Sequence, residues 1–261
     1  MTNTSTMPDG AESRWFSVNR RSGRSAIRLF CFPYAGGGSL IYRSWLDALP
    51  DLFEIFPVRL PGREARLNDA PFKRIEPLIY ELGEAILPYL DRPFAFFGHS
   101  MGAKIAFELA RHLSQKGLEA LHLFVSGARG PQVPRTEPPT YALPEPEFVE
   151  NLRDLNGTPN EVLENPELMR LIIPLLRADF ELVQNYAYNP GPPLSYPITA
   201  YGGLEDRYVL REHINAWAQE TSGSFTMRMF PGDHFFINTS RLLVLQSVAQ
   251  ELQRRLLRKA A

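Results

Sequence analysis

The sequence is poor in several features that would place the chain in other classes of protein. Its 261 residues include one cysteine, Cys31, which cannot form an internal disulfide or a zinc site built from several cysteines. The 28 Lys and Arg nearly balance the 29 Asp and Glu, so no overall field favours nucleic acid or anionic lipid. No apolar run approaches the roughly 20 residues of a membrane span, and residues 1–14 lack the apolar segment of a secretory signal. We therefore expect a cytoplasmic protein that binds neither nucleic acid nor membrane.

Short apolar runs alternate along the chain with amphipathic stretches. The runs, at 14–18, 27–32, 52–58, 94–97, 121–126, 197–202 and 225–230, are typical of strands covered on both faces. The amphipathic stretches, at 74–90, 101–116, 208–221 and 239–258, predict helices. Together they predict an α/β fold with a mostly parallel sheet of about seven strands flanked by helices. We expect one domain over 14–261, preceded by a flexible polar tail at 1–13.

One segment, at about 131–195, interrupts this alternation. Thirteen of the 23 prolines lie between Pro131 and Pro197, and no strand pattern occurs there. Helical patterns occur at roughly 145–156, 160–164 and 167–188, the last interrupted by Pro174. An insertion of this length is too long for an ordinary connection, so we expect a helical lid over a site. A separate small helical domain is the alternative.

The sequence GHSMG at 98–102 fits the G-x-S-x-G pattern of a nucleophile elbow. A predicted strand comes directly before it, and an amphipathic helix follows directly. Such an abrupt turn forces the central residue into a strained, positive-φ conformation and leaves no room for a Cβ at Gly98 or Gly102. Ser100 is therefore the candidate nucleophile. The alternative is a glycine-rich turn whose serine has no catalytic role.

A serine hydroxyl needs a base to become a nucleophile, and the chain has five histidines. His99, His112, His122 and His213 fall inside the elbow, a strand or helices, where we expect structural or surface roles. His234 follows the last predicted strand in the turn PGDH at 231–234, where this kind of fold delivers its base. His234 is therefore the candidate base.

The acid that orients the base is expected after the penultimate strand. Glu205 and Asp206 are both candidates there, and Asp206 could instead cap the next helix. An oxyanion hole needs two backbone N–H donors. Met101, directly after the nucleophile, supplies one, and Ala35 in the loop PYAGGG at 33–38 is our choice for the second. A phosphate-binding loop is the alternative for these glycines, but neither Lys-Ser/Thr nor a G-x-G-x-x-G pattern accompanies them.

These motifs together resemble the thioesterase family of α/β-hydrolases, and within it the stand-alone type II thioesterases of polyketide and non-ribosomal peptide synthesis. The resemblance spans about 25–256. It rests on LFCFPYAGGG (29–38), VRLPGREAR (58–66), FFGHSMGAKIAFELAR (96–111), PITAYGGLEDRYV (197–209) and FPGDHFF (230–236). It implies an α/β-hydrolase fold and a triad of Ser100, His234 and Asp206, since the family's acid in a G-G-x-x-D stretch corresponds to Asp206. Ala35 and Met101 correspond to the family's oxyanion donors.

The resemblance also implies an activity. It implies hydrolysis of acyl groups held as thioesters on the 4′-phosphopantetheine arm of acyl or peptidyl carrier proteins, through an acyl-serine and with no cofactor. Its role would be editing, the release of stalled or misprimed units from a partner synthase, and we expect a monomer. Three alternatives stay open: a hydrolase of acyl-CoA or oxygen esters, a terminal domain that releases finished products, and a non-catalytic protein that binds acyl carriers.

Two further groups of residues have open roles. Apolar residues of the expected lid should mainly pack against the body, with a minority lining an acyl chamber. These are Leu171, Ile172, Ile173, Leu175, Leu176, Phe180, Val183 and Tyr186. Arg59, Arg63 and Arg66 follow a predicted strand near the expected mouth of the site. They could meet the phosphate of the arm or acidic carrier helices, or form a solvated, salt-bridged corner.

Overall fold

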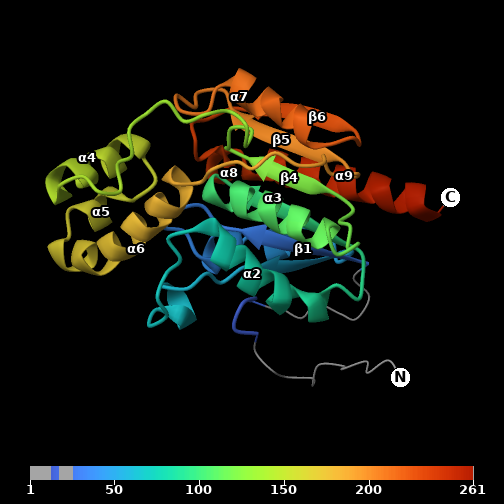
Figure 1. Ribbon diagram of the computed structural model, residues 1–261, viewed down its shortest axis with the longest axis horizontal. Coiled ribbons are helices and arrows are strands. Elements are labelled where there is room, and N and C mark those ends of the chain that lie inside the picture. Colours follow the sequence, from blue (N-terminus) through green and yellow to red (C-terminus); the bar gives the residue numbers. More distant parts are fainter. Residues whose placement is uncertain (1–12, 18–25, 261) are drawn as a thin grey trace.

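The computed structural model describes residues 13–17 and 26–260, which have an α/β architecture (Figure 1). Apart from Ser13, the tail predicted at 1–13 lies outside the described residues. Six parallel strands form one sheet in the order β2-β1-β3-β4-β5-β6. No helix in the described part of the chain is both long enough and apolar enough to cross a membrane.

The elements follow the alternation that the sequence predicts. The strands are β1 (Ile27–Phe32), β2 (Phe53–Pro57), β3 (Phe94–His99), β4 (Leu123–Ser126), β5 (Ile198–Gly203) and β6 (Phe225–Phe230). The α-helices of the body are α1 (Trp45–Ala48), α2 (Ile75–Ile86), α3 (Met101–Ser114), α7 (Arg211–Asn215), α8 (Phe236–Thr239) and α9 (Arg241–Ala260). Short 3-10 helices lie at Ser39–Tyr42, Glu64–Arg66, Leu87–Tyr89 and Ala216–Glu220.

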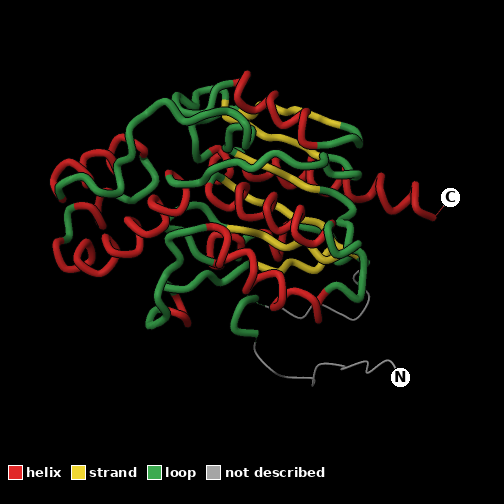
Figure 2. Tube along the Cα trace, in the orientation of Figure 1, coloured by secondary structure: helices red, strands yellow, loops and turns green. Residues whose placement is uncertain are grey.

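Both faces of the sheet are buried, as Figure 2 shows from the helices in front of and behind the strands. Successive side chains of a strand point to opposite faces. Phe30 and Phe96 therefore join a core with α2 and α3, whereas Leu29 and Phe97 join a second core with α1 and α9. This double burial explains why nearly continuous apolar runs form the strands.

The described residues form six strands rather than about seven, because the run predicted as a strand at 14–18 does not pair as one. Of its described residues 14–17, Phe16 alone makes a bridge, to Val58. The Phe16 ring is buried against Phe30, Phe56 and Tyr89. Its hydrophobicity therefore reflects side-chain packing and not a sheet ladder.

The chain between β4 and β5, here called the insertion, holds α4 (Glu145–Leu155), α5 (Asn160–Leu163) and α6 (Pro166–Gln184). These three helices match the predicted ones and project to one side of the sheet (Figure 1). They share a small apolar core that includes Phe148, Leu152 and Ile173.

Contrary to the prediction, Pro174 does not interrupt the last helix of the insertion. α6 runs through it. Pro174 and Arg170 are both exposed. The carbonyl that loses its helical partner is that of Arg170, so it lies where water can reach it.

Candidate active site

Ser100 lies at the sharp junction between β3 and α3, with φ +54° and ψ −114°. The neighbouring backbone leaves no space for larger residues on either side. A Cβ on Gly98 would lie 2.1 Å from the carbonyl oxygen of Gly102, and one on Gly102 would lie 2.1 Å from that of Phe32. Both glycines are therefore required by the turn that the GHSMG sequence predicts.

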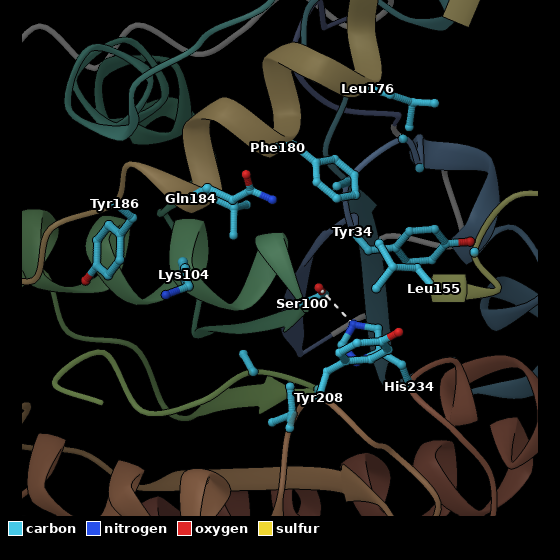
Figure 3. Close-up of a pocket in the computed structure, with 18 of the residues that line it drawn as sticks. Tyr34, Ser100, Lys104, Leu155, Leu176, Phe180, Gln184, Tyr186, Tyr208 and His234 are labelled. Carbon is cyan, nitrogen blue, oxygen red and sulfur yellow. Dashed lines mark hydrogen bonds between the residues drawn. The ribbon is translucent and has the colours of Figure 1, made fainter. Parts of the chain in front are cut away.

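His234 and Asp206 form a hydrogen-bonded line with Ser100 (Figure 3). The distance from Ser100 Oγ to His234 Nε2 is 3.0 Å, and that from His234 Nδ1 to Asp206 Oδ2 is 2.7 Å. Because a carboxylate can only accept, the Nδ1 proton of a neutral imidazole points to Asp206. Nε2 is then free to accept the hydroxyl proton of Ser100. The sequence-predicted nucleophile, base and acid thus meet at one point.

The surroundings of Asp206 keep it ionised and fixed in place. Its side chain is 1% exposed, and its Oδ1 accepts hydrogen bonds from the backbone N–H of Tyr208 and Val209. Burial alone would raise the pKa of Asp206, but the hydrogen bond and charge of His234 and these two N–H groups outweigh it. The net result is a pKa below the ordinary value. Oδ2 is left to hold His234.

The competing acidic residues lie elsewhere. Glu205 is exposed, and its backbone N–H bonds to the carbonyl of Gly232. Asp233, next to His234, accepts a hydrogen bond from the N–H of Phe235 and another from the side chain of Asn156. The geometry therefore favours Asp206. Asp206 is not the cap of α7, which begins only at Arg211.

The other histidines have the structural surroundings that the sequence predicts. His99 is buried under the site, with Nδ1 2.9 Å from Ser126 Oγ and its ring 5.4 Å from the ring of His234. His122 is buried beside Thr199, and burial lowers its pKa to about 3. Both rings are therefore held in the neutral form at ordinary pH.

The loop that carries Ala35 runs from the end of β1 along the cavity that contains Ser100. Its shape is held by α6, because Asp179 Oδ2 accepts a hydrogen bond of 2.8 Å from the N–H of Gly36, which has φ +78°. Arg63 pairs with both oxygens of Asp179, at 2.9 and 2.7 Å, and donates to the carbonyl of Gly37. Ala35 lines the cavity. The roles predicted for the N–H groups of Ala35 and Met101 stay predictions.

The cavity between the body and the insertion has a volume of about 1230 Å³. Ser100 and His234 lie on its wall, and the sides are mixed in character (Figure 3). Leu155, Leu176 and Phe180 form an apolar part, while the side chains of Lys104, Gln184 and Tyr186 form a polar part. Among the described residues, no cluster of three His, Cys, Asp or Glu side chains could hold a metal ion.

The comparison with known proteins agrees with this geometry. The family model of the thioesterase domain matches residues 27–256. The chain belongs to the thioesterase family. It is 42% identical over 245 residues to linear gramicidin dehydrogenase LgrE of Brevibacillus parabrevis, covering 92% of this chain and 93% of that one. It is 40% identical over 242 residues to the gramicidin S biosynthesis protein GrsT of Aneurinibacillus migulanus, covering 92% and 94%.

A solved structure extends the likeness to the fold. The type II thioesterase BorB from the borrelidin biosynthetic cluster matches with a TM-score of 0.85 and 35% identity, over 91% of this chain and 97% of that one. The predicted resemblance to type II thioesterases and the predicted α/β-hydrolase fold are confirmed. The chain is a hydrolase that acts on thioesters.

The expectation that only a minority of the eight apolar insertion residues would line the chamber is wrong, because six of them line the cavity of this thioesterase: Ile172, Leu175, Leu176, Phe180, Val183 and Tyr186. The other two do not. Leu171 is 71% exposed, and Ile173 is buried in the core of the insertion itself. α6 faces both the core of the insertion and the cavity. It therefore needs apolar residues on more than one face.

The three arginines after β2 do not form a solvated corner. Arg63 is buried with Asp179, and Arg66 is buried beside Asp69 with its guanidinium 4.1 Å from the ring centre of Trp15. Arg59 bonds to Ser17. Of the three, only Arg63 lines the cavity, and its charge is already paired.

Two residues of the thioesterase site were missed by the sequence reasoning. Asp179 is an acid among the apolar residues of an amphipathic helix, which was a usable signal, because an unpaired charge is not buried. Lys104 lies in the first turn of α3, which begins directly after Ser100, and its side chain enters the cavity. Its position in the first turn after the nucleophile was the available signal.

Proposed function

We propose that this thioesterase releases acyl groups from the phosphopantetheine arm of acyl or peptidyl carrier proteins, with Ser100, His234 and Asp206 as its triad. The observation that carries the proposal is the unbroken line of hydrogen bonds, 3.0 and 2.7 Å long, on the wall of a cavity of about 1230 Å³. Names of relatives that point to peptide and polyketide biosynthesis support the choice of carrier proteins as partners.

The first half of the proposed cycle forms an acyl-enzyme. Ser100 Oγ attacks the thioester carbonyl while His234 Nε2 takes its proton, and Asp206 stabilises the resulting imidazolium. The N–H groups of Ala35 and Met101 are assigned to the oxyanion of the tetrahedral intermediate. The C–S bond then breaks, and the imidazolium gives its proton to the departing sulfur.

The second half repeats this chemistry with water. His234 takes a proton from water, whose oxygen attacks the acyl-Ser100 ester and forms a second oxyanion at the same place. The C–O bond to Ser100 breaks and the proton returns to its oxygen, so a free acid leaves and the enzyme is restored. The cycle needs no cofactor besides the arm that carries the substrate. We assign the insertion the role of a lid, because its helices supply one wall of the cavity.

A dehydrogenase activity, which appears in the name of LgrE, has less support. It would need a nucleotide site, and the glycine-rich loop after β1 lacks the G-x-G-x-x-G pattern. The backbone of Gly36 and Gly37 in that loop is already bound by Asp179 and Arg63. The loop also lies along the same cavity as Ser100. Hydrolysis is the activity that this arrangement supports best.

Intact-mass analysis of acyl-loaded carrier proteins tests the proposal. Wild-type enzyme should return the carrier to its free-thiol mass, and Ser100→Ala should leave it loaded, with kcat at least ~10³-fold lower. Asp206→Asn should lower kcat by roughly 10⁴-fold with little change in KM, because the imidazole loses its fixed orientation. Ser195→Ala, an exposed serine bonded to Glu119 on the surface, is the matched control and should keep full activity.

Two outcomes would contradict the proposal. If wild type and Ser100→Ala release acyl groups equally, Ser100 is not the nucleophile. If kcat/KM for a p-nitrophenyl ester or acyl-CoA exceeds that for the same acyl group on a carrier by orders of magnitude, the substrate is a small ester or CoA thioester.

A further inference from the structure

The side chain of Lys104 enters the catalytic cavity from the first turn of α3. The three residue steps of α3 from Met101 to Lys104 correspond to a rise of about 4.5 Å, and the length of the lysine side chain can carry its charge further from the nucleophile. In the view of Figure 3, Lys104 and His234 lie on opposite sides of Ser100, with Gln184 and Tyr186 near the lysine. Lys104 Nζ lies 4.4 Å from the ring centre of Tyr186.

No carboxylate in the described part of the chain pairs with Lys104. The nearest acid on its own helix, Glu108, accepts hydrogen bonds from Tyr186 at 2.5 Å and from Arg111 at 3.2 Å. Two more cations, Arg129 and Arg135, line the same cavity, together with Glu137, which pairs with Arg129 at 2.9 Å. The charges of the two arginines act on Lys104 more strongly than that of Glu108 does. The field at its amine is therefore positive.

A purely structural role for Lys104 does not explain why its charge lies in the cavity wall without a carboxylate partner. Packing in the cavity wall removes most of the water around the amine, which lowers the pKa of Lys104 to about 8. A cation placed over a tyrosine ring recovers only part of this cost. An apolar side chain would fill the same place without this desolvation cost. A cation that faces the cavity without a carboxylate partner is what an anionic ligand requires.

The mechanism fixes which part of the substrate reaches Lys104. The sulfur must leave beside His234, which protonates it, and the carbonyl oxygen must face the N–H groups of Ala35 and Met101. The acyl chain takes the remaining side, and in the view of Figure 3 Lys104 lies on the side of Ser100 away from His234. The phosphate of the arm is a full pantetheine length away from the thioester, so it is not the anion next to this lysine.

We propose that Lys104 forms a subsite for acyl groups that bear a carboxylate a few carbons beyond the thioester carbonyl. The proposal rests on the function proposed above and adds a preference to it. An incoming carboxylate is attracted directly by Lys104. It is also attracted by the positive charges of Arg129 and Arg135, which line the same cavity. A positively charged aminoacyl group is repelled by the same charges.

Thioesters of N-acetylcysteamine test this subsite, because they lack the phosphate of the arm. Glutaryl and pentanoyl thioesters have the same number of carbons, and a carboxylate replaces the terminal methyl in the first. In Lys104→Met, the ratio of kcat/KM for glutaryl to that for pentanoyl should fall about tenfold or more. Lys104→Arg should keep most of the preference. Lys116→Met is the matched control, since this lysine is exposed and pairs with Glu84, and it should leave the ratio unchanged.

A second measurement uses wild type alone and does not depend on how a variant folds. Between pH 7 and 9 Lys104 loses its proton, so the glutaryl preference should fall as pH rises through about 8. The charged and titratable groups around it are Glu108, Tyr186, Arg129, Arg135 and Glu137, the last of which pairs with Arg129. The pKa of Tyr186 is raised by burial and by Glu108, so Tyr186 keeps its proton over this range. Any effect of pH on the chemistry of the triad acts on both thioesters alike and cancels in the ratio.

The outcomes separate this inference from the proposed function. If Lys104→Met slows both thioesters equally and the wild-type ratio is flat between pH 7 and 9, the subsite is overturned while the hydrolase stands. If wild type hydrolyses neither thioester nor an acyl-carrier protein, the proposed function fails first.

Discussion

Two of the seams at which the insertion meets the body differ greatly in strength. At the first seam α6 meets the loop after β1 through Asp179, which is 3% exposed and bonds to Arg63 and to the N–H of Gly36. At the second seam the end of α4 meets the loops that carry His234 and Asp206. There Asn156 donates to Asp233 over 3.1 Å, and the Tyr208 hydroxyl donates to the carbonyl of Asp154 over 3.4 Å.

The difference lies in solvent access and in the number of charge-assisted bonds. Arg63 and Asp179 form a bidentate pair with little access to water, and breaking one partner leaves an uncompensated buried charge. The bonds of the second seam lie at exposed side chains, where water can replace either partner. The insertion is therefore held by strong, buried bonds beside the proposed oxyanion loop and by weak, exposed bonds beside His234. We therefore expect that opening at the second seam would expose the cavity without disturbing the loop of Ala35.

Breaking the first seam should have the largest effect. Asp179→Leu removes the acceptor of the Gly36 N–H and leaves Arg63 buried without its carboxylate. We expect a loss of about 3–5 kcal/mol in the free energy of unfolding, measured by urea denaturation, and a fall in kcat of more than about tenfold, since the loop of Ala35 is no longer held.

The double variant Arg63→Met/Asp179→Leu separates the two consequences. It removes both charges, so much of the lost stability should return. The Gly36 N–H still lacks its acceptor, so kcat should stay low. Recovery of kcat together with stability would mean that the Asp179 bond to Gly36 does not hold the loop.

Adding a methyl group at the second seam, where space is lacking, should have an intermediate effect. A Cβ on Gly157 would lie 2.4 Å from Cζ of Phe235, whose ring packs edge-on against His234 and Tyr34. Gly157→Ala should therefore displace Phe235, cost about 1–3 kcal/mol of stability and lower kcat/KM by about tenfold or less. Unchanged kinetics with pentanoyl thioester would show that the ring of Phe235 turns aside without moving His234.

Removing one bond of the second seam should have the smallest effect. Asn156 has φ +56°, and Asn156→Gly keeps this conformation accessible while deleting the bond to Asp233. We expect at most about 1 kcal/mol of lost stability and less than a threefold change in kcat/KM. A loss as large as that of Asp179→Leu would contradict the contrast between the seams.

Much of the site could be predicted because its chemistry depends on neighbours in sequence. The turn at Ser100 needs Gly98 and Gly102 within two residues, and His234 and Asp206 follow the ends of strands, where parallel sheets gather loops at one edge. The strands themselves follow from runs buried on both faces, as in β1 and β3.

What could not be predicted depends on partners far apart in the chain. The run at 14–18 is as hydrophobic as a strand, but the Phe16 side chain packs against the rings of Phe30 and Tyr89 instead. Arg63 and Asp179 are 116 residues apart, and nothing near either residue shows that they pair. Lys104 has the position of a cavity residue, but its lack of a carboxylate partner appears only when Arg111 and Tyr186 are seen to engage Glu108.

Cys31 has a practical consequence for an enzyme whose product is a thiol. It is the only cysteine in the chain, it has no accessible surface in β1, and burial raises its pKa well above the ordinary value. A thiol that is neither exposed nor ionised cannot form a mixed disulfide with the released arm or capture the acyl group by exchange. Disulfide reagents that report free thiols by colour can therefore follow turnover continuously on the native enzyme without a background from the protein itself.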